Sequence, residues 1–400
     1  MMNEPRNRPP ASDRSTKNPD VKVDPEYVKA FIQNLFKDDM HAARVLSLAS
    51  GVVGVLHAAA LAIHAIGQAY AKVANITPKS GVKQVDRLLS NAGFDMNVVL
   101  KPWVKYVVGV RKEIVVVLDW TDFEKDDHTT LCAYLMTRHG RATPLAWKTV
   151  KKSTLKGTRN DHEYSLVERL HEAIEKDVDV TLVADRGFGD HKLYEFLQGL
   201  GWDFVIRFRG GIAVQNAAGE TRAAEEWVPA NGRATILRNV RVTDDHAEVP
   251  AVVVVRAPKM KEAWCLATTL SKRKASDVVK IYGKRFTIEE TFRDEKNLHF
   301  GMGLSATHIR DASRRDRLLL LAAIAHALLT LLGAASEEAG LDRYLKVNTV
   351  KRRTHSLYRQ GLYWYDCIPT MREDWLRRLM TAFDRIVREQ AVMREVLGVI

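Results

Sequence analysis

The stretch EIVVVLDWTDF, residues 113–123, is a continuous apolar run that is rich in valine and closes in polar residues. Such a run is typical of a strand that is buried on both faces of a sheet. The stretch DVTLVADRGFGD, residues 179–190, repeats this pattern and continues into a loop that contains glycine. Asp119 closes the first strand and Asp185 closes the second. If these strands are neighbours, the two carboxylates lie side by side at the sheet edge where α/β folds build their sites.

The segments around these two strands alternate between strand and helix patterns. TTLCAYLMTR and ATPLAWKTV are strand-like, and residues 161–177 place Leu166, Leu170 and Ile174 on one helix face. HKLYEFLQGLG predicts a further helix, and WDFVIRFRG a further strand. The order predicts an α/β arrangement in which helices cover a mixed sheet. Between about 210 and 270 the helical period is absent and short strand patterns alternate with turn signals, which predicts a β-rich insertion.

The composition indicates a globular protein with a polyanionic partner. The chain has 400 residues, with 46% hydrophobic and 28% charged residues, enough for two or three domains. Its 61 Lys and Arg outnumber 49 Asp and Glu, and this balance favours nucleic acid, although a merely basic protein is the alternative. Cys132, Cys265 and Cys367 are far apart and show no CxxC spacing. This excludes a disulfide framework and a thiolate zinc site, and predicts a reducing cytoplasm.

The regions outside the central part are predicted to be a tail and helices. Residues 1–24 lack the apolar region of a signal peptide and are predicted to be disordered. Residues 25–108 have helical patterns, and a capped basic helix within 79–95 either contacts DNA or packs in a small bundle. Residues 46–63 and 318–332 are apolar but contain His57 and His326, and they predict buried helices rather than membrane spans.

The stretch KIYGKRFTIEETFRDEKN, residues 280–297, mixes acidic, basic and aromatic residues. At about 100° per residue, one stripe of a continuous helix collects Tyr282, Arg285, Glu289, Arg293 and Lys296. Ile281, Ile288 and Phe292 gather on another arc, which predicts the core face. One carboxylate therefore lies among cations and a phenol, an arrangement that suits a site for phosphate and a metal ion.

Asp119, Asp185 and Glu289 form a candidate metal site. Three carboxylates without a thiol or histidine cluster suit Mg²⁺ or Mn²⁺. Two such ions can activate an attacking oxygen and stabilise a leaving oxygen in phosphoryl transfer. Each part alone has an ordinary explanation, because an Asp after a strand is commonly a turn residue and a Glu among cations commonly makes surface pairs.

The spacing of these residues resembles a known family signature. Tyr282, Arg285, Glu289 and Lys296 match the Y-R-E-K signature of the insertion-sequence-four family of bacterial DDE transposases. LDWT at 118–121 is similar to that family's first Asp segment, and VADRGF at 183–188 to its second. The resemblance covers the chain from about 110 to 330.

The resemblance implies a ribonuclease-H-like catalytic core at 109–209 and 271–333, interrupted by a β-strand domain at 210–270. Outside this resemblance, the helical patterns predict an N-terminal DNA-binding region at 25–108 and a C-terminal helical region at 334–400. The resemblance further implies cleavage at transposon ends and strand transfer into target DNA, using Mg²⁺ or Mn²⁺ and two ions. A homodimer in the DNA complex, no membrane association and a location in the bacterial cytoplasm complete this expectation.

The resemblance also implies residue roles. Asp119, Asp185 and Glu289 would hold the metal ions. Tyr282, Arg285 and Lys296 would contact DNA phosphates. Arg293 joins this expected set from its place in the helix stripe and not from the signature. Trp264 lies where family members stack a flipped base, and core packing is the alternative for this residue.

Three rival functions remain open. A tyrosine recombinase would use Tyr282 as a nucleophile, but this gives the aspartates no task. A transposase-derived DNA-binding protein would have a dead site. A metal-dependent endonuclease without strand transfer would need the same metal site.

Several other polar residues receive structural predictions. Asp122, Asp126 and Asp127 are expected in a solvated turn, and His128 has no evident partner. His57 and His64 are expected on one helix face as packing residues. Three basic tracts are candidates for DNA contact, at 272–285, 314–317 and 346–359. The aromatic run at 363–365 is expected in the core of the C-terminal helices.

Overall fold

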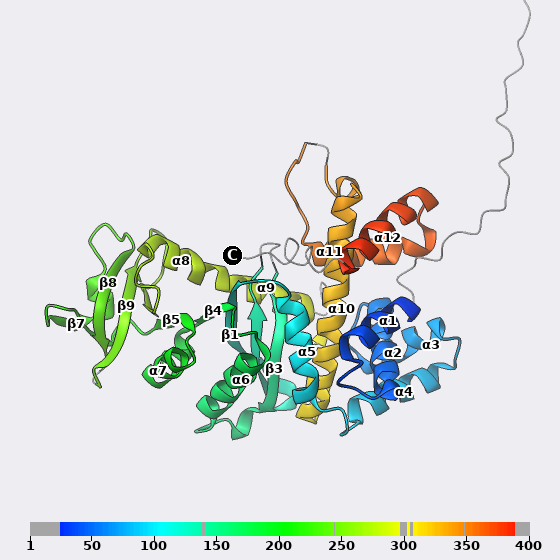
Figure 1. Cartoon of the computed structure of the whole chain (residues 1–400), viewed down its shortest axis with the longest axis horizontal. Helices are drawn as coiled ribbons and strands as arrows, with labels where there is room; N and C mark the ends of the chain where they lie inside the picture. Colours follow the sequence, from blue (N-terminus) through cyan, green and yellow to red (C-terminus); the bar gives the residue numbers. More distant parts are fainter. Residues whose placement is uncertain are drawn as a thin grey trace, which may run out of the picture.

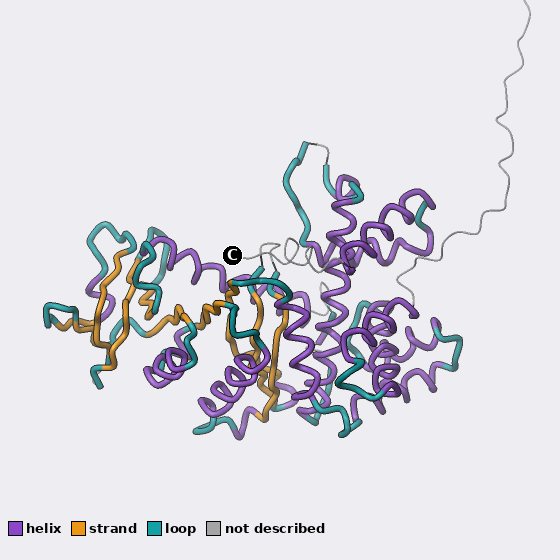
Figure 2. Tube along the Cα trace, viewed as in Figure 1, coloured by secondary structure: helices purple, strands orange, loops and turns teal. Residues whose placement is uncertain are grey.

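The computed structural model describes residues 25–388 except 138–140, 244, 297–301, 305–306 and 348, with no side chains described at 25, 292–296 and 388. The predicted tail at 1–24 lies outside the described residues. The strands occupy the centre and one end of an elongated molecule, and the N-terminal and C-terminal helices gather at the other end (Figures 1 and 2).

One sheet of ten strands runs through the described part of the chain in the order β3-β2-β1-β4-β5-β10-β9-β8-β6-β7. The strand bounds are Glu113–Phe123 (β1), His128–Leu135 (β2), Thr143–Lys151 (β3), Asp179–Ala184 (β4), Asp203–Phe208 (β5), Ala213–Gln215 (β6), Thr221–Ala223 (β7), Thr235–Val242 (β8), Ala247–Val255 (β9) and Trp264–Thr268 (β10). β1 pairs antiparallel with β2 and parallel with β4, and β4 pairs parallel with β5. This mixed half of the sheet is the ribonuclease-H-like core that the sequence predicts.

The β-rich insertion lies between Asp185 and Glu289 and extends the same sheet. β10 pairs antiparallel with β5, and β9, β8, β6 and β7 follow outward. The insertion forms the end of the molecule that carries β7, β8 and β9 (Figure 1). β6 and β7 have three residues each, too few to produce a recognisable alternation in the sequence.

Helices cover the sheet and build the rest of the molecule. Their bounds are Pro25–Phe36 (α1), Ala42–Ala58 (α2), Ile63–Val73 (α3), Pro78–Ser90 (α4), Met96–Val108 (α5), Arg159–Ala173 (α6), His191–Gly199 (α7), Ala275–Gly283 (α8), Thr287–Lys296 (α9), Ala312–Glu338 (α10), Leu357–Cys367 (α11) and Glu373–Arg388 (α12). α5, α6 and α10 contact β3, and α7 contacts β5. α10 runs through the domain boundary predicted near residue 334.

α10 is the spine that joins the sheet to both helical groups. It contacts β3, α2, α4, α11 and α12. Among the described helices, α10 alone is long and apolar enough to cross a membrane as one straight helix, and its apolar window is wholly buried inside the protein. Its apolar run is therefore the buried helix that the sequence predicts. α11 crosses it closely, because a Cβ on Gly361 would lie 1.7 Å from the Leu329 carbonyl oxygen.

The N-terminal helices differ from the prediction for His57 and His64. α2 and α3 meet at a bend of 99°, so His57 and His64 lie on different helices instead of on one face. His57 packs edge-on against Tyr365, with ring centres 5.3 Å apart. The N-cap of α4 is Thr77, whose hydroxyl oxygen accepts from the Ser80 backbone N–H, and Pro78 occupies the first turn.

The expectation that Asp126 lies in a solvated turn is wrong. Its side chain is 6% exposed and pairs with Arg315, whose side chain is fully buried. Arg315 Nε also donates to Nδ1 of His128 at 3.1 Å, so this histidine has a partner, and the guanidinium lies 4.0 Å from the Phe123 ring centre. Asp127 and Asp122 are less enclosed and bond to Ser153 and Lys152.

The basic tract at 314–317 therefore makes structural contacts, and the prediction that it is a candidate for DNA contact is wrong. Arg315 is buried against Asp126, and Arg317 donates to the backbone carbonyls of Leu89 and Phe94. Arg314 pairs with Asp86 on α4. In the aromatic run of α11, Trp364 and Tyr365 are buried as predicted, but Tyr363 is 52% exposed.

We predict that Asp126→Ala lowers the free energy of unfolding by about 3–5 kcal/mol, because it leaves the buried Arg315 charge without its carboxylate. Asp122→Ala is the matched control, since the side chain of Asp122 is 45% exposed and bonds to Lys152. It should cost less than about 1 kcal/mol. Urea unfolding measures both, and equal losses would contradict the structural role of the buried pair.

Candidate active site

The parallel pairing of β1 with β4 brings Asp119 and Asp185 together. The register pairs Leu118 with Ala184, so the next residue on each chain stands at the same sheet edge. β1 continues to Phe123 along β2, which places Asp119 within the strand and not at its end. The prediction that the two carboxylates are neighbours is nevertheless confirmed by the register.

Asp185 is held by the turn that follows β4. Its Oδ1 accepts from the Gly187 backbone N–H at 2.8 Å, which caps the 3₁₀ turn Arg186–Phe188. Phe188 is buried and anchors this turn. A Cβ on Gly187 would lie only 3.0 Å from Asp185 Oδ1, so this position has little room for a side chain.

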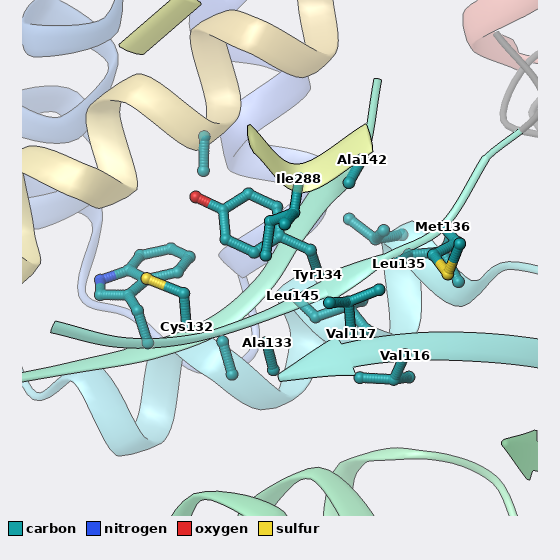
Figure 3. Close-up of a cluster of buried hydrophobic side chains, with 14 of the residues drawn as sticks. Val116, Val117, Cys132, Ala133, Tyr134, Leu135, Met136, Ala142, Leu145 and Ile288 are labelled. Atoms are coloured by element: carbon teal, nitrogen blue, oxygen red, sulfur yellow. The ribbon is translucent and has the colours of Figure 1, made fainter. Parts of the chain in front are cut away.

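Glu289 reaches the site because α9 packs across the sheet. Ile288 is fully buried and points from α9 into the apolar side chains of β1, β2 and β3 (Figure 3). The Thr291 hydroxyl donates to the carbonyl oxygen of Ala142 at 3.2 Å and accepts from its N–H at 2.9 Å. With this side of α9 fixed, the Glu289 side chain stays 55% exposed near Asp119.

Arg285 joins the carboxylates of the candidate site. Its Nη1 lies 3.1 Å from Asp119 Oδ2, and its Nη2 lies 3.6 Å from Glu289 Oε1. The Arg285 side chain is only 11% exposed. Arg285 was expected to contact DNA phosphate; in the structure it neutralises two of the three acids.

The single continuous helix predicted for 280–297 is wrong, because a 3₁₀ turn at Lys284–Phe286 separates α8 from α9. The predicted stripe nevertheless persists in part, because Arg285 contacts both the Tyr282 hydroxyl and the Glu289 carboxylate. Tyr282 is 1% exposed and lies beneath the site, where its hydroxyl hydrogen-bonds with Arg285 and burial raises its pKa. Its predicted direct contact with phosphate is not what this conformation shows. The Arg293 and Lys296 side chains lie outside the described residues.

Trp264 begins β10 and packs against Tyr282. The two rings meet edge-on, with centres 4.9 Å apart, and the Phe286 ring centre lies 6.0 Å from that of Trp264. Trp264 is half-buried, and Phe286 is exposed. Trp264 is therefore packed in the core on one side only. Its other side and Phe286 leave an aromatic surface beside Arg285.

The surroundings of Asp119 raise the pKa of its carboxyl group. Burial is the largest cause and raises the pKa of Asp119 to about 6; Arg285 opposes this, and the charges of Asp185 and Glu289 add to it. These couplings show that the three acids interact electrostatically. A cluster of like charges that is only partly neutralised favours a bound cation.

The residues fit a metal site by chemistry, and Arg285 now stands between two of them. Within the described residues, no group of three acidic, histidine or cysteine side chains is close enough to hold an ion together. The oxygen-only donor set of Asp119, Asp185 and Glu289 suits a hard divalent cation. A bound ion would compete with Arg285 for the carboxylates of Asp119 and Glu289.

The sequence reasoning missed two polar groups that border the site. Glu163 on α6 accepts from Trp120 Nε1 at 2.7 Å and from Arg159 Nε at 3.0 Å. Glu262 pairs with both Arg186 and Arg207, at 3.2 and 2.8 Å. Only the four-residue spacing of Arg159 and Glu163 was visible in the sequence, and that spacing alone is typical of surface pairs.

We predict that the stability of wild type relative to Asp119→Asn falls as the pH rises, in EDTA. The folded-state pKa of about 6 exceeds the ordinary 3.8, so the carboxyl group contributes stability that is fully present below 3.8 and is lost as the pH rises through 6. Between about pH 4 and about pH 7.5 the difference should change by up to about 3 kcal/mol. Thermal unfolding across this range measures it.

Asp177→Asn provides a control of opposite sign, because a hydrogen bond from Lys112 lowers the pKa of Asp177. The stability of wild type relative to Asp177→Asn should increase as the pH rises through the acidic range. A flat difference for Asp119→Asn, together with the expected trend for Asp177→Asn, would show that the Asp119 carboxyl is not perturbed.

A comparison with known families agrees with this geometry. The model of the family described as "Transposase DDE domain" matches residues 111–328, more than half of the chain. A search of the curated proteins finds no match. The matched range contains Asp119, Asp185, Glu289 and Arg285, and members of this family act on DNA and generally use divalent metal ions. The chain belongs to the DDE transposase family.

Proposed function

We propose that this protein cuts DNA at the ends of an insertion sequence and joins those ends to target DNA by metal-dependent phosphoryl transfer. The observation that carries the proposal is the register of β1 and β4, which places Asp119 beside Asp185, with Glu289 brought to them by α9. The resemblance of Tyr282, Arg285, Glu289 and Lys296 to the insertion-sequence-four signature supports the same activity.

In this proposal Asp119, Asp185 and Glu289 hold Mg²⁺ or Mn²⁺, in two sites. Bound ions would supply charge neutralisation at the attacking and leaving oxygens. A water oxygen first attacks a phosphodiester and releases a DNA 3′-hydroxyl. That hydroxyl then attacks a target phosphodiester, so one phosphorus–oxygen bond forms as another breaks in each step.

In this reaction the Arg285 guanidinium would bind a DNA phosphate. Its guanidinium is now shared between Asp119 and Glu289, and its third contact is the Tyr282 hydroxyl. A phosphate at this place offers the same planar pair of oxygens that a carboxylate does. Arg285 would therefore exchange the acids for a DNA phosphate while Tyr282 keeps hold of it from below.

The buried position of Tyr282 argues against the tyrosine recombinase alternative. A covalent nucleophile has to reach the phosphorus, and this phenol is 1% exposed beneath Trp264 and Arg285. Burial also raises its pKa, which disfavours the reactive phenolate. The endonuclease and the inactive DNA-binding alternatives share the observed site, so the reaction products decide between them.

The partners proposed are double-stranded DNA at the transposon ends and at the target. A homodimer in the DNA complex follows from pairing two such ends. The exposed basic residues before α8, at 272–274, are the most direct DNA contacts among the predicted tracts, because α8 leads to Arg285.

We predict that Glu289→Gln abolishes metal-dependent cleavage while DNA binding persists. Glu290→Gln is the matched control, because it changes the adjacent carboxylate without altering the proposed metal ligands, and it should cut within a few fold of wild type. The substrate is a labelled duplex that spans the junction between the element's end and its flanking DNA, with Mg²⁺ or Mn²⁺. Denaturing gels report cleavage, and joined products in a plasmid target report strand transfer.

The outcomes separate the candidate functions. Cleavage without any joined product would identify an endonuclease. Binding without cleavage in wild type would identify an inactive DNA-binding protein. Cutting by Glu289→Gln as fast as by wild type would remove Glu289 from the site, and a metal-independent protein–DNA adduct that disappears in Tyr282→Phe would restore the recombinase.

We predict that Trp264→Ala reduces processing of the DNA end by about 10–100-fold, because it removes a stacking surface for an unpaired base worth about 1–3 kcal/mol. Trp264→Phe keeps an aromatic face and should retain most of the activity. The assay counts hairpin ends and nicked ends on denaturing gels. If flanking ends remain unjoined in wild type, or if both variants behave as wild type, Trp264 has only its packing role against Tyr282.

A further inference from the structure

A buried carboxylate behind the candidate active site has no task in the chemistry proposed so far. Glu163 lies on α6 and is 3% exposed. It accepts from the indole of Trp120, the residue that follows Asp119, and from Arg159 at the start of α6. Burial raises the pKa of Glu163, and these two donors counteract that effect. Burying a carboxylate costs desolvation free energy even when a cation pairs with it, which suggests that the pair of Glu163 and Arg159 has a further role.

Arg159 is held by one nitrogen and by two aromatic rings. Its guanidinium carbon lies 5.4 Å from the Trp120 ring centre and 5.6 Å from that of Phe188. Arg159 Nε donates a hydrogen bond to Glu163 Oε1. Among the described residues, neither terminal nitrogen has a hydrogen-bond partner, and the side chain is 41% exposed. The guanidinium is therefore oriented while its strongest donor pair faces outward.

The outward pair lies next to Asp185. A Cβ on Gly187 would be 3.3 Å from Arg159 Nη2 and 3.0 Å from Asp185 Oδ1, so the cation and the acid flank the same glycine. Successive strand residues point to opposite faces, so Trp120 and Arg159 lie on the face opposite Asp119 and Arg285. Two guanidinium groups thus border the edge that carries both aspartates, one from each face of the sheet.

We propose that Arg159 binds a backbone phosphate of the DNA beside Asp185, and that Glu163 and Trp120 position it for this contact. The ligand class is a phosphodiester, which an oriented guanidinium binds through two parallel N–H donors. The inference rests on the proposed action on DNA. It adds a second phosphate contact whose position does not depend on the metal-binding carboxylates.

The competing explanation is that Arg159 only neutralises the buried Glu163. The two explanations differ in what happens when both charges are removed together. Arg159→Gln alone leaves the Glu163 carboxylate buried and destabilises the fold. Adding Glu163→Gln removes that carboxylate and should restore the unfolding midpoint, yet a phosphate contact made by Arg159 stays lost.

The experiment measures DNA affinity against salt concentration in the Glu289→Gln background, which keeps the duplex intact. The probe is a fluorescein-labelled duplex spanning the element's end, and anisotropy gives the slope of log affinity against log salt. Arg159→Gln/Glu163→Gln should reduce the magnitude of this slope by about 0.9, the value for one lost phosphate contact. Arg169→Gln is the control on α6, because Arg169 already bonds to Asn97 and Ser165, and its slope should match the parent.

Arg159→Lys with Glu289 intact adds a kinetic test. It keeps the charge but loses the planar donor pair, so the slope should stay near that of wild type while the cleavage rate at saturating DNA falls about tenfold or more. A double variant that recovers both its stability and the parental slope would overturn the inference and leave Arg159 as a structural partner. Absence of DNA binding in the parent, or of cleavage in the chain with Glu289 intact, would instead refute the proposed function.

Discussion

The parallel pairing of β1 with β4 is the constraint on which the rest of the site depends. It aligns Asp119 with Asp185 at one edge, and α9 adds Glu289, so three acids share a partly buried place. Burial of Asp119 and the charges of the other two acids raise the pKa of Asp119 and so oppose its ionisation. Arg285 relieves part of this cost in the DNA-free protein because it contacts two of the acids at once. The sheet thus creates a local excess of negative charge that a cation has to balance.

The same sheet needs rigid support from elements far away in the chain. α9 is fixed by Ile288 in the core and by Thr291 bonded to Ala142 in the segment before β3, and this fixes the direction of Glu289. α10 in turn is tied to the sheet by the buried Arg315–Asp126 pair and by Asp316, which accepts from the Thr149 N–H at 2.9 Å. Buried polar contacts of this kind specify one docking position, which apolar packing alone leaves less defined.

Local patterns were enough to predict the strands and the two aspartates, because the apolar runs before Asp119 and Asp185 have few alternative structures. Contacts between distant segments were not predictable in this way. Asp126 and Arg315 are 189 residues apart, so a carboxylate in a turn pattern and a cation in a basic tract both lacked a visible partner. Tyr282 was placed on the correct side, beside Arg285, but its burial against Trp264 could not be predicted, because Trp264 lies outside the local pattern.

The guanidinium groups of Arg285 and Arg159 differ in which contacts each must give up before it can bind a phosphate. Arg285 is bound to Asp119 and Glu289, so it can accept a phosphate only as those acids gain another cation. In the proposed function, metal binding and phosphate binding at Arg285 would therefore be coupled, because each would remove the competitor of the other. Arg159 is held by Glu163, which lies outside the proposed metal ligands, and its terminal nitrogens already face outward. On this reasoning DNA can first engage the Arg159 side of the edge without metal, and the Arg285 side becomes available only when the ions are in place.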